Sequence, residues 1–192
     1  MTSLKLSLIL LFLSISAYGQ QHLCFEGIPI DGSLAEFTNA MTKLGYTHDG
    51  TQDSMVIFTG DFHDFKNCLI GVSTPKDYDE VNLIGVLLPE RLTWEMILSD
   101  YHTLKNMLID QYGWPKKIAE YTPQNIADSS STVILQALHR EEVLWQATYT
   151  TALGNIILSI VYGSQINTGM VLVQYYDAIN SDPDRKEAMD DL

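Results

Sequence analysis

Apolar and polar residues alternate in two regions of the chain, 55–88 and 143–176. In the second region, Trp145 and Tyr149 point to one side of an extended chain, and Thr148 points to the other. A period of two is typical of strands that bury one face, as antiparallel sheets do. Each region therefore predicts three antiparallel strands, joined first by a short turn and then by a longer polar loop.

A stretch with helical periodicity precedes each of these regions. The first expected helix begins at Ser33, which forms a capping-box pattern with Glu36, and it ends at Gly45. The second covers about 93–112 and ends at Gly113. Apolar residues recur on one side of both helices. The two stripes are Leu34, Phe37, Met41 and Leu44, and then Trp94, Ile97, Tyr101, Leu104 and Leu108.

The two alternating regions can be aligned with each other through small insertions. The alignment places Phe58 on Trp145 and Leu83 on Val173. We therefore expect an α+β fold that is a tandem repeat. Each repeat is a helix followed by an antiparallel meander of three to four strands, and the helices pack on one face of the sheet.

The expected organisation is a single domain, residues 20–180, followed by a charged tail, 181–192. The two repeats span about 22–90 and 91–180 of this domain. Residues 132–139 read either as the first strand of a hairpin or as a short helix.

Residues 1–19 have the order of a secretory signal peptide. Lys5 precedes an apolar run, 6–15, and the small residues Ala17 and Gly19 form a cleavage site. The run is shorter than the roughly 20 residues of a membrane span. We expect cleavage after Gly19, export to the periplasm or the medium, and no stable membrane anchor afterwards.

The chain is acidic, with 24 Asp and Glu against 11 Lys and Arg, a formal net charge of −13 over 192 residues. This charge disfavours binding to nucleic acid and to anionic membrane surfaces. The only two cysteines, Cys24 and Cys68, permit one disulfide in an exported chain. Such a bond would stabilise the fold by about 4 kcal/mol in the chain-entropy model. Two free thiols are the alternative, because the spacing does not give the bond geometry.

Several motifs of the chain resemble a family of small secreted proteins from Bacteroidetes-type bacteria, which is largely uncharacterised. The motifs are "FEGIPIDGSLAEF", "YGWP" and "VQYYDAIN". The tandem arrangement is more loosely similar to the architecture of the β-lactamase inhibitor protein, whose curved sheet binds other proteins. The first resemblance implies an exported protein, and the second implies a sheet that binds a protein partner. Neither carries catalytic residues over to this chain.

The best candidates for chemistry are Asp61, His63 and Asp64 in "GDFHDF". Carboxylates and imidazole bind divalent metals, so a metal-dependent hydrolase is an alternative function. Alternation places Asp61 and His63 on one strand face and Asp64 in the turn, and a fourth ligand must come from elsewhere. The sequence has no nucleophile elbow and no glycine-rich phosphate loop, so we expect no cofactor and no catalytic residues.

The leading hypothesis is an exported, non-catalytic binding protein that uses the sheet face turned away from the helices. This face is expected to carry Thr, Gln, Ile and Tyr, and such a weakly apolar surface suits a protein or glycan partner. A homo-oligomer or a structural subunit of the envelope is the other alternative. The expected binding residues are Gln146, Thr148, Thr150, Asn155, Ser159, Gln174 and Tyr176.

Overall fold

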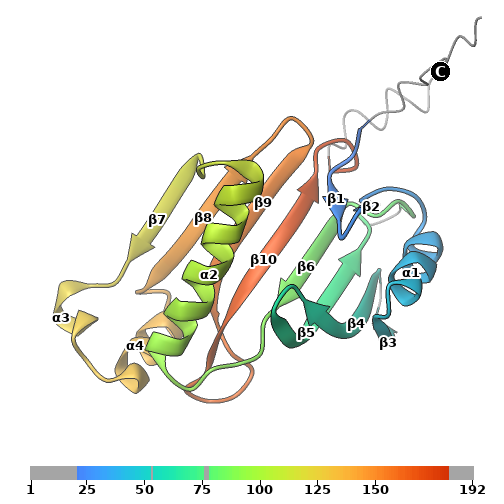
Figure 1. The fold of residues 1–192 in the computed structure, drawn as a ribbon. Coiled ribbons are helices and arrows are strands. Elements are labelled where there is room, and N and C mark those ends of the chain that lie inside the picture. Colours follow the sequence, from blue (N-terminus) through green and yellow to red (C-terminus); the bar gives the residue numbers. More distant parts are fainter. Residues whose placement is uncertain (1–20, 53, 76–77, 182–192) are drawn as a thin grey trace, which may run out of the picture.

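The computed structural model describes residues 21–52, 54–75 and 78–181, which form an α+β fold around one eight-stranded antiparallel sheet (Figure 1). The expected signal peptide and nearly all of the expected tail lie outside the described residues. The strands of the sheet are β3 (Thr47–Gln52), β4 (Met55–Phe62), β5 (Phe65–Ser73), β6 (Leu83–Leu87), β7 (Lys117–Tyr121), β8 (Leu144–Thr150), β9 (Gly154–Tyr162) and β10 (Gly169–Asp177). Their spatial order is β3-β4-β5-β6-β10-β9-β8-β7.

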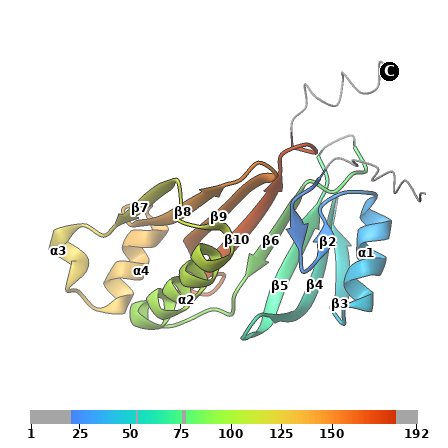
Figure 2. The ribbon, with the colours of Figure 1, turned by 45° about the horizontal axis from the view of Figure 1, so that its top comes forward.

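In the described part of the chain, four helices and a small two-stranded ribbon accompany the sheet. The helices are α1 (Leu34–Lys43), α2 (Trp94–Tyr112), α3 (Gln124–Ala127) and α4 (Ser131–His139), and the ribbon pairs β1 (Cys24–Phe25) with β2 (Ile28–Pro29). The helices α1, α2 and α4 lie on the same side of the sheet (Figure 2). Helix α2 contacts β9 and β10, α4 contacts β9, and α1 contacts β3. Among the described residues, the helices and the ribbon therefore cover one face of the sheet and leave the opposite face open.

The ends of both long helices are where the sequence predicts them. The Ser33 side chain accepts a hydrogen bond from the Glu36 amide, and the Glu36 carboxylate accepts one from the Ser33 amide. Gly45 and Gly113 have φ values of +97° and +79°, which suit glycine after the last helical turn. All five stripe residues of α2 are buried. In the stripe of the first helix, Phe37 and Met41 are buried, but Leu44 is the C-cap residue after α1 and is 52% exposed, so its place in the buried stripe was wrong.

One open alternative of the sequence analysis is decided by the structure, and two parts of the sheet region differ from the expectation. Residues 132–139 lie in α4, so the short-helix alternative is correct. The outer strands β3 and β7 were not predicted, because edge strands have little buried surface and hence little alternation. Leu83 lies on the open side of the sheet whereas Val173 is buried, so that part of the repeat alignment is wrong by one position. The tandem repeat itself stays a prediction.

The sheet consists of two groups of four strands, β3 to β6 and β7 to β10. The two groups join where β6 pairs with β10, and we call this junction the seam. Leu83–Leu87 pair with residues 172–176 in an antiparallel register. This pairing joins strands that are about ninety residues apart, and it makes the sheet continuous from β3 to β7.

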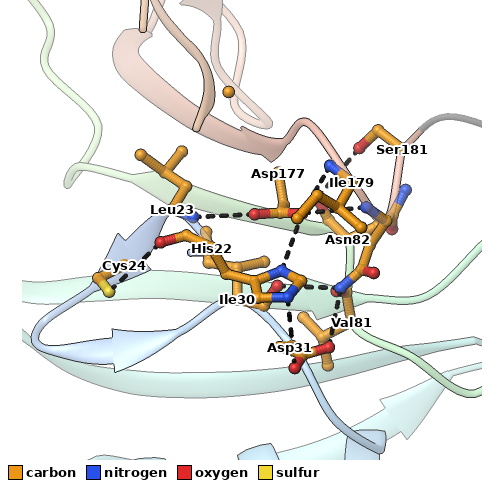
Figure 3. A network of polar contacts seen from close by, with 12 residues as sticks. His22, Leu23, Cys24, Ile30, Asp31, Val81, Asn82, Asp177, Ile179 and Ser181 are labelled. Carbon is orange, nitrogen blue, oxygen red and sulfur yellow. Dashed lines mark hydrogen bonds and ion pairs between the residues drawn. The ribbon is translucent and has the colours of Figure 1, made fainter. Parts of the chain in front are cut away.

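A buried carboxylate, Asp177, ties the end of β10 to both ends of the described chain (Figure 3). Its side chain accepts hydrogen bonds from the backbone amides of Leu23 at 2.8 Å, Ile179 at 2.9 Å and Asn180 at 3.0 Å. The His22 ring nitrogen Nδ1 lies 3.2 Å from the same carboxylate. Asp177 has no exposed surface, so each partner depends on this acceptor.

We expect Asp177→Ala to lower the free energy of unfolding by about 3 kcal/mol, because several buried amides lose their acceptor. Ser181→Ala is the matched control, since the Ser181 hydroxyl is exposed and makes one long hydrogen bond of 3.4 Å to the Asn82 carbonyl. Denaturant unfolding of both variants measures the difference. Equal losses in the two variants would contradict the role of the buried carboxylate.

A second carboxylate, Glu90, holds the loop between β9 and β10. It accepts hydrogen bonds from the Ser164 amide at 2.7 Å, the Ser164 hydroxyl at 2.5 Å and the Thr168 hydroxyl at 2.6 Å. The hydrogen bond from the Ser164 side chain, followed by that from Thr168, lowers the pKa of Glu90 from 4.5 to about 2.

Because the folded state lowers the pKa of Glu90, its contribution to stability is present above pH 4.5 and is lost as the pH falls towards 2. We expect Glu90→Gln to cost about 1 kcal/mol at neutral pH, a value reduced for solvent screening. The variant should also lose less stability than the parent protein between pH 4.5 and 2. Urea unfolding at several pH values tests this, and parallel pH profiles for the two proteins would rule it out.

Candidate functional site

The sheet face opposite the helices is the candidate site, and we call it the open face. Three rows of residues, paired in register across β4, β5, β6, β10, β9 and β8, define it. The rows are Met55, Ser73, Leu83, Tyr176, Asn155 and Thr150; Ile57, Gly71, Gly85, Gln174, Ile157 and Thr148; and Thr59, Leu69, Leu87, Leu172, Ser159 and Gln146. All of these residues are exposed or half-buried.

No residue in the three rows is charged, although 18% of the chain is Asp, Glu, Lys or Arg. Charged side chains lie at the margins of the open face instead. Asp49 and Asp61 lie at its β3 and β4 side, and Lys117 lies on the outer strand β7. Charge is therefore kept off a surface that crosses six strands, so the open face can lose its water at a lower cost than the rest of the surface.

The structure places all seven sequence-predicted binding residues on the open face, within strands β8, β9 and β10. Two of them contact each other directly, since the Thr150 hydroxyl donates to the Asn155 side-chain oxygen at 2.9 Å. Cross-strand pairing also brings Thr148 beside Ile157 and Gln146 beside Ser159. Alternation in β8, β9 and β10 was therefore enough to place these seven residues on one surface.

The half of the open face on β4, β5 and β6 was not identified from the sequence. It contains an apolar hollow of about 260 Å³, which we call the glycine socket. Its lining residues are Met55, Ile57, Leu69, Ile70, Gly71, Ser73, Leu83, Gly85, Leu87, Leu172 and Gln174. Gly71 and Gly85 pair with each other across β5 and β6, so no side chain rises from the centre of the socket.

One signal in the sequence marks the glycine socket. The tetrapeptide Leu-Ile-Gly-Val occurs at residues 69–72 and again at 83–86. Both copies lie on paired strands, which brings the two glycines opposite each other. Glycine weakens a strand interior and often marks a place where another group comes close to the backbone.

Asp61, His63 and Asp64 are not gathered into a metal centre. Strand β4 ends at Phe62 and His63 takes a φ of +52° in the turn, so the expected alternation of Asp61 and His63 is wrong. The Asp61 carboxylate lies 2.8 Å from the Lys66 amine, which lowers the pKa of Asp61. Asp61 and His63 line a polar hollow of about 620 Å³ beside Tyr46. Within the described residues, no three His, Cys, Asp or Glu side chains are arranged to hold a metal ion.

The structure does not join the two cysteines. Cys24 is exposed on the β1–β2 ribbon, whereas Cys68 is fully buried in β5. Burial raises the pKa of the Cys68 thiol to about 11, so this thiol is neutral and a poor nucleophile.

No known protein family, characterised protein or solved structure matched the chain when it was compared with them. In the part of the chain that the structure describes, no helix has the length and apolar character of a membrane span.

We expect zinc, manganese and calcium to leave the melting temperature unchanged, because Lys66 already neutralises Asp61 and no other described acid or histidine completes a site. Thermal unfolding with each metal in excess measures this. A saturable rise that disappears in Asp61→Asn would contradict it and would support the hydrolase alternative.

Proposed function

We propose that the chain is an exported, non-catalytic binding protein and that another protein docks on the open face. The observation that carries this proposal is the absence of charge from all three rows of a surface that spans six strands. Charged residues are depleted from the centres of protein interfaces, where water is excluded, and are common on ordinary surfaces.

The chemistry of the open face favours a protein over a glycan. Leu69, Leu87 and Leu172 lie side by side across β5, β6 and β10, and Leu69 is 49% exposed. Thr, Gln and Asn side chains lie on one side of this aliphatic centre, on β8 and β9. An apolar centre with a polar margin is the usual anatomy of a protein–protein interface.

The proposal also includes the tandem repeat and the export of the chain. The spatial order β3-β4-β5-β6 followed by β10-β9-β8-β7 supports two similar halves that meet at the β6–β10 seam. In this account, each half is a helix followed by antiparallel strands, similar to the β-lactamase-inhibitor-protein arrangement. Residues 1–19 direct the chain to the periplasm or the medium, where the open face meets its partner.

We expect the double variant Thr148→Asp/Tyr176→Asp to weaken partner binding by about 30-fold or more, because two carboxylates must be buried at the interface. Both side chains are half-buried on the open face, so the fold should persist and the circular dichroism should not change. The measurement is pull-down of the partner from the native envelope fraction, followed by titration with the recovered protein.

The matched control is Met96→Asp/Ser99→Asp, which adds the same charge to exposed positions of α2 on the covered side. A photo-reactive residue at Thr148, but not at Met96, should also give one discrete adduct. Normal partner binding by the Thr148/Tyr176 variant would show that the open face is the wrong surface. An adduct of twice the mass of the chain would instead identify a homo-oligomer.

A further inference from the structure

The glycine socket lies on the open face, and its two central glycines cost stability. Gly71 and Gly85 are in strand interiors, where glycine has no side chain to pack and loses much chain entropy on folding. Neither has the positive φ that would require glycine. A Cβ at Gly85 would meet its nearest atom, Leu172 Cδ1, at 3.8 Å, which is an ordinary contact. Backbone geometry therefore does not explain why this position lacks a side chain.

Another strand glycine of the same sheet, Gly60, is covered by an aromatic side chain. On the covered face, Gly60 of β4 lies under the ring of Tyr46, and a Cβ at Gly60 would clash with the ring atom Cδ1. The aromatic ring lies against the bare backbone, which is how aromatic side chains commonly cover glycines in sheets. Gly71 and Gly85 have no such ring. The Met55 side chain lies against Gly71 instead, with Sδ 3.2 Å from a Cβ placed there, and Leu172 Cδ1 is the nearest side-chain atom to Gly85.

We propose that the glycine socket receives an aromatic side chain of the partner protein, and that basic residues flank this side chain. The proposal rests on the proposed function of the open face and specifies the residue that the face recognises. A ring that enters a hollow of about 260 Å³ would lie on Gly85 and, once the flexible Met55 side chain turns aside, on Gly71, as the Tyr46 ring lies on Gly60.

The walls of the socket fit an aromatic ring with a polar atom. Ile57 and Gln174 close it at the two ends of the middle row, and Leu69 and Leu87 form one side. These side chains supply apolar contact, and the Gln174 amide is a hydrogen-bond partner for an indole or phenol. Tryptophan and tyrosine are the residues that most often anchor protein interfaces in this way.

The negative charge near the socket indicates which residues of the partner should flank the aromatic ring. Asp49 is exposed at the β3–β4 margin, and Thr59, which donates to the Asp49 carboxylate, pairs with Leu69 of the socket. Asp61 at the same margin is already paired with Lys66. The whole chain carries a net charge of −13. Lysine or arginine beside the aromatic residue would therefore be attracted to Asp49 and to the acidic chain as a whole, whereas acidic neighbours would be repelled.

The test uses the full exported chain labelled with ¹⁵N and the peptide Ac-Lys-Trp-Lys-NH₂ as the probe. We expect saturable upfield shifts of the Gly71 and Gly85 resonances, because a ring stacked on the backbone shields them. A single anchor of this size predicts a millimolar dissociation constant. Ac-Lys-Leu-Lys-NH₂ should bind at least threefold more weakly, and Ac-Glu-Trp-Glu-NH₂ at least tenfold more weakly.

Variants that place a side chain in the socket at Gly85 provide a second test. Gly85→Val should raise the dissociation constant at least tenfold while it keeps or raises the melting temperature, since valine favours strands. Gly50→Val is the control, because Gly50 lies on β3 beside Ile57 but outside the socket, with open space around its Cβ position. Gly85→Ala, which meets Leu172 at an ordinary distance, replaces the valine variant if that variant fails to fold.

Several results would overturn the proposal. The first is the absence of shifts with the tryptophan peptide, and the second is equal binding of this peptide by the parent protein and Gly85→Val. The third is binding of the leucine peptide or of decanoate that is as tight as, or tighter than, that of the tryptophan peptide. Such binding of decanoate would indicate an acyl-chain groove. Shifts at Gly71 and Gly85 that depend on protein concentration alone would instead assign the socket to a second copy of this chain.

The peptide titration and the cross-linking from Thr148 together distinguish a failure of this proposal from a failure of the proposed function. An adduct from Thr148 without peptide binding would leave the open face as a docking surface and reject the aromatic anchor. Peptide binding without any adduct from Thr148 would keep the socket and reject the wider docking surface.

Discussion

The pairing of β6 with β10 is the constraint on which the rest of the structure depends. Five residues of each strand join two groups of strands that are distant in the sequence into one sheet. Without this seam there would be two small sheets, each with an additional exposed edge. The seam also completes the glycine socket, whose floor comes from β5 and β6 and whose far wall comes from Leu172 and Gln174 of β10. Asp177, the last residue of β10, then fastens the end of the seam to residues 22–23 and 179–180.

The two faces of this sheet have different physical roles. The covered face buries large side chains such as Phe58 and Tyr149, together with Tyr101 from helix α2, and this burial supplies the main driving force for folding. The open face contributes less to stability, because its side chains remain in contact with water. It nevertheless carries two strand glycines and a row of leucines, which a surface selected only for stability and solubility would avoid. The features that cost the fold stability therefore coincide with the proposed docking surface.

Local patterns in the sequence predicted the parts of the structure that depend on local interactions. The Ser33–Glu36 cap, the helix end at Gly113 and the alternation of β8 and β9 all follow from neighbouring residues. The β6–β10 seam was not predictable in this way, because its register is set by packing between residues far apart in the chain. The same reason explains why the open face was only half identified. Its β8–β10 part follows from alternation, whereas the glycine socket appears only when Gly71 and Gly85 are paired.

The central claim is that the open face, and not the helix-covered side, meets the partner. Methyl cross-saturation in a complex with the recovered partner tests this directly, because only methyl groups at the interface lose intensity. The account predicts losses at Met55, Ile57, Leu69 and Leu172 on the open face, with Leu92, Met96 and Val133 unaffected. Losses confined to Leu92, Met96 and Val133, which are exposed on and beside the helices, would contradict it.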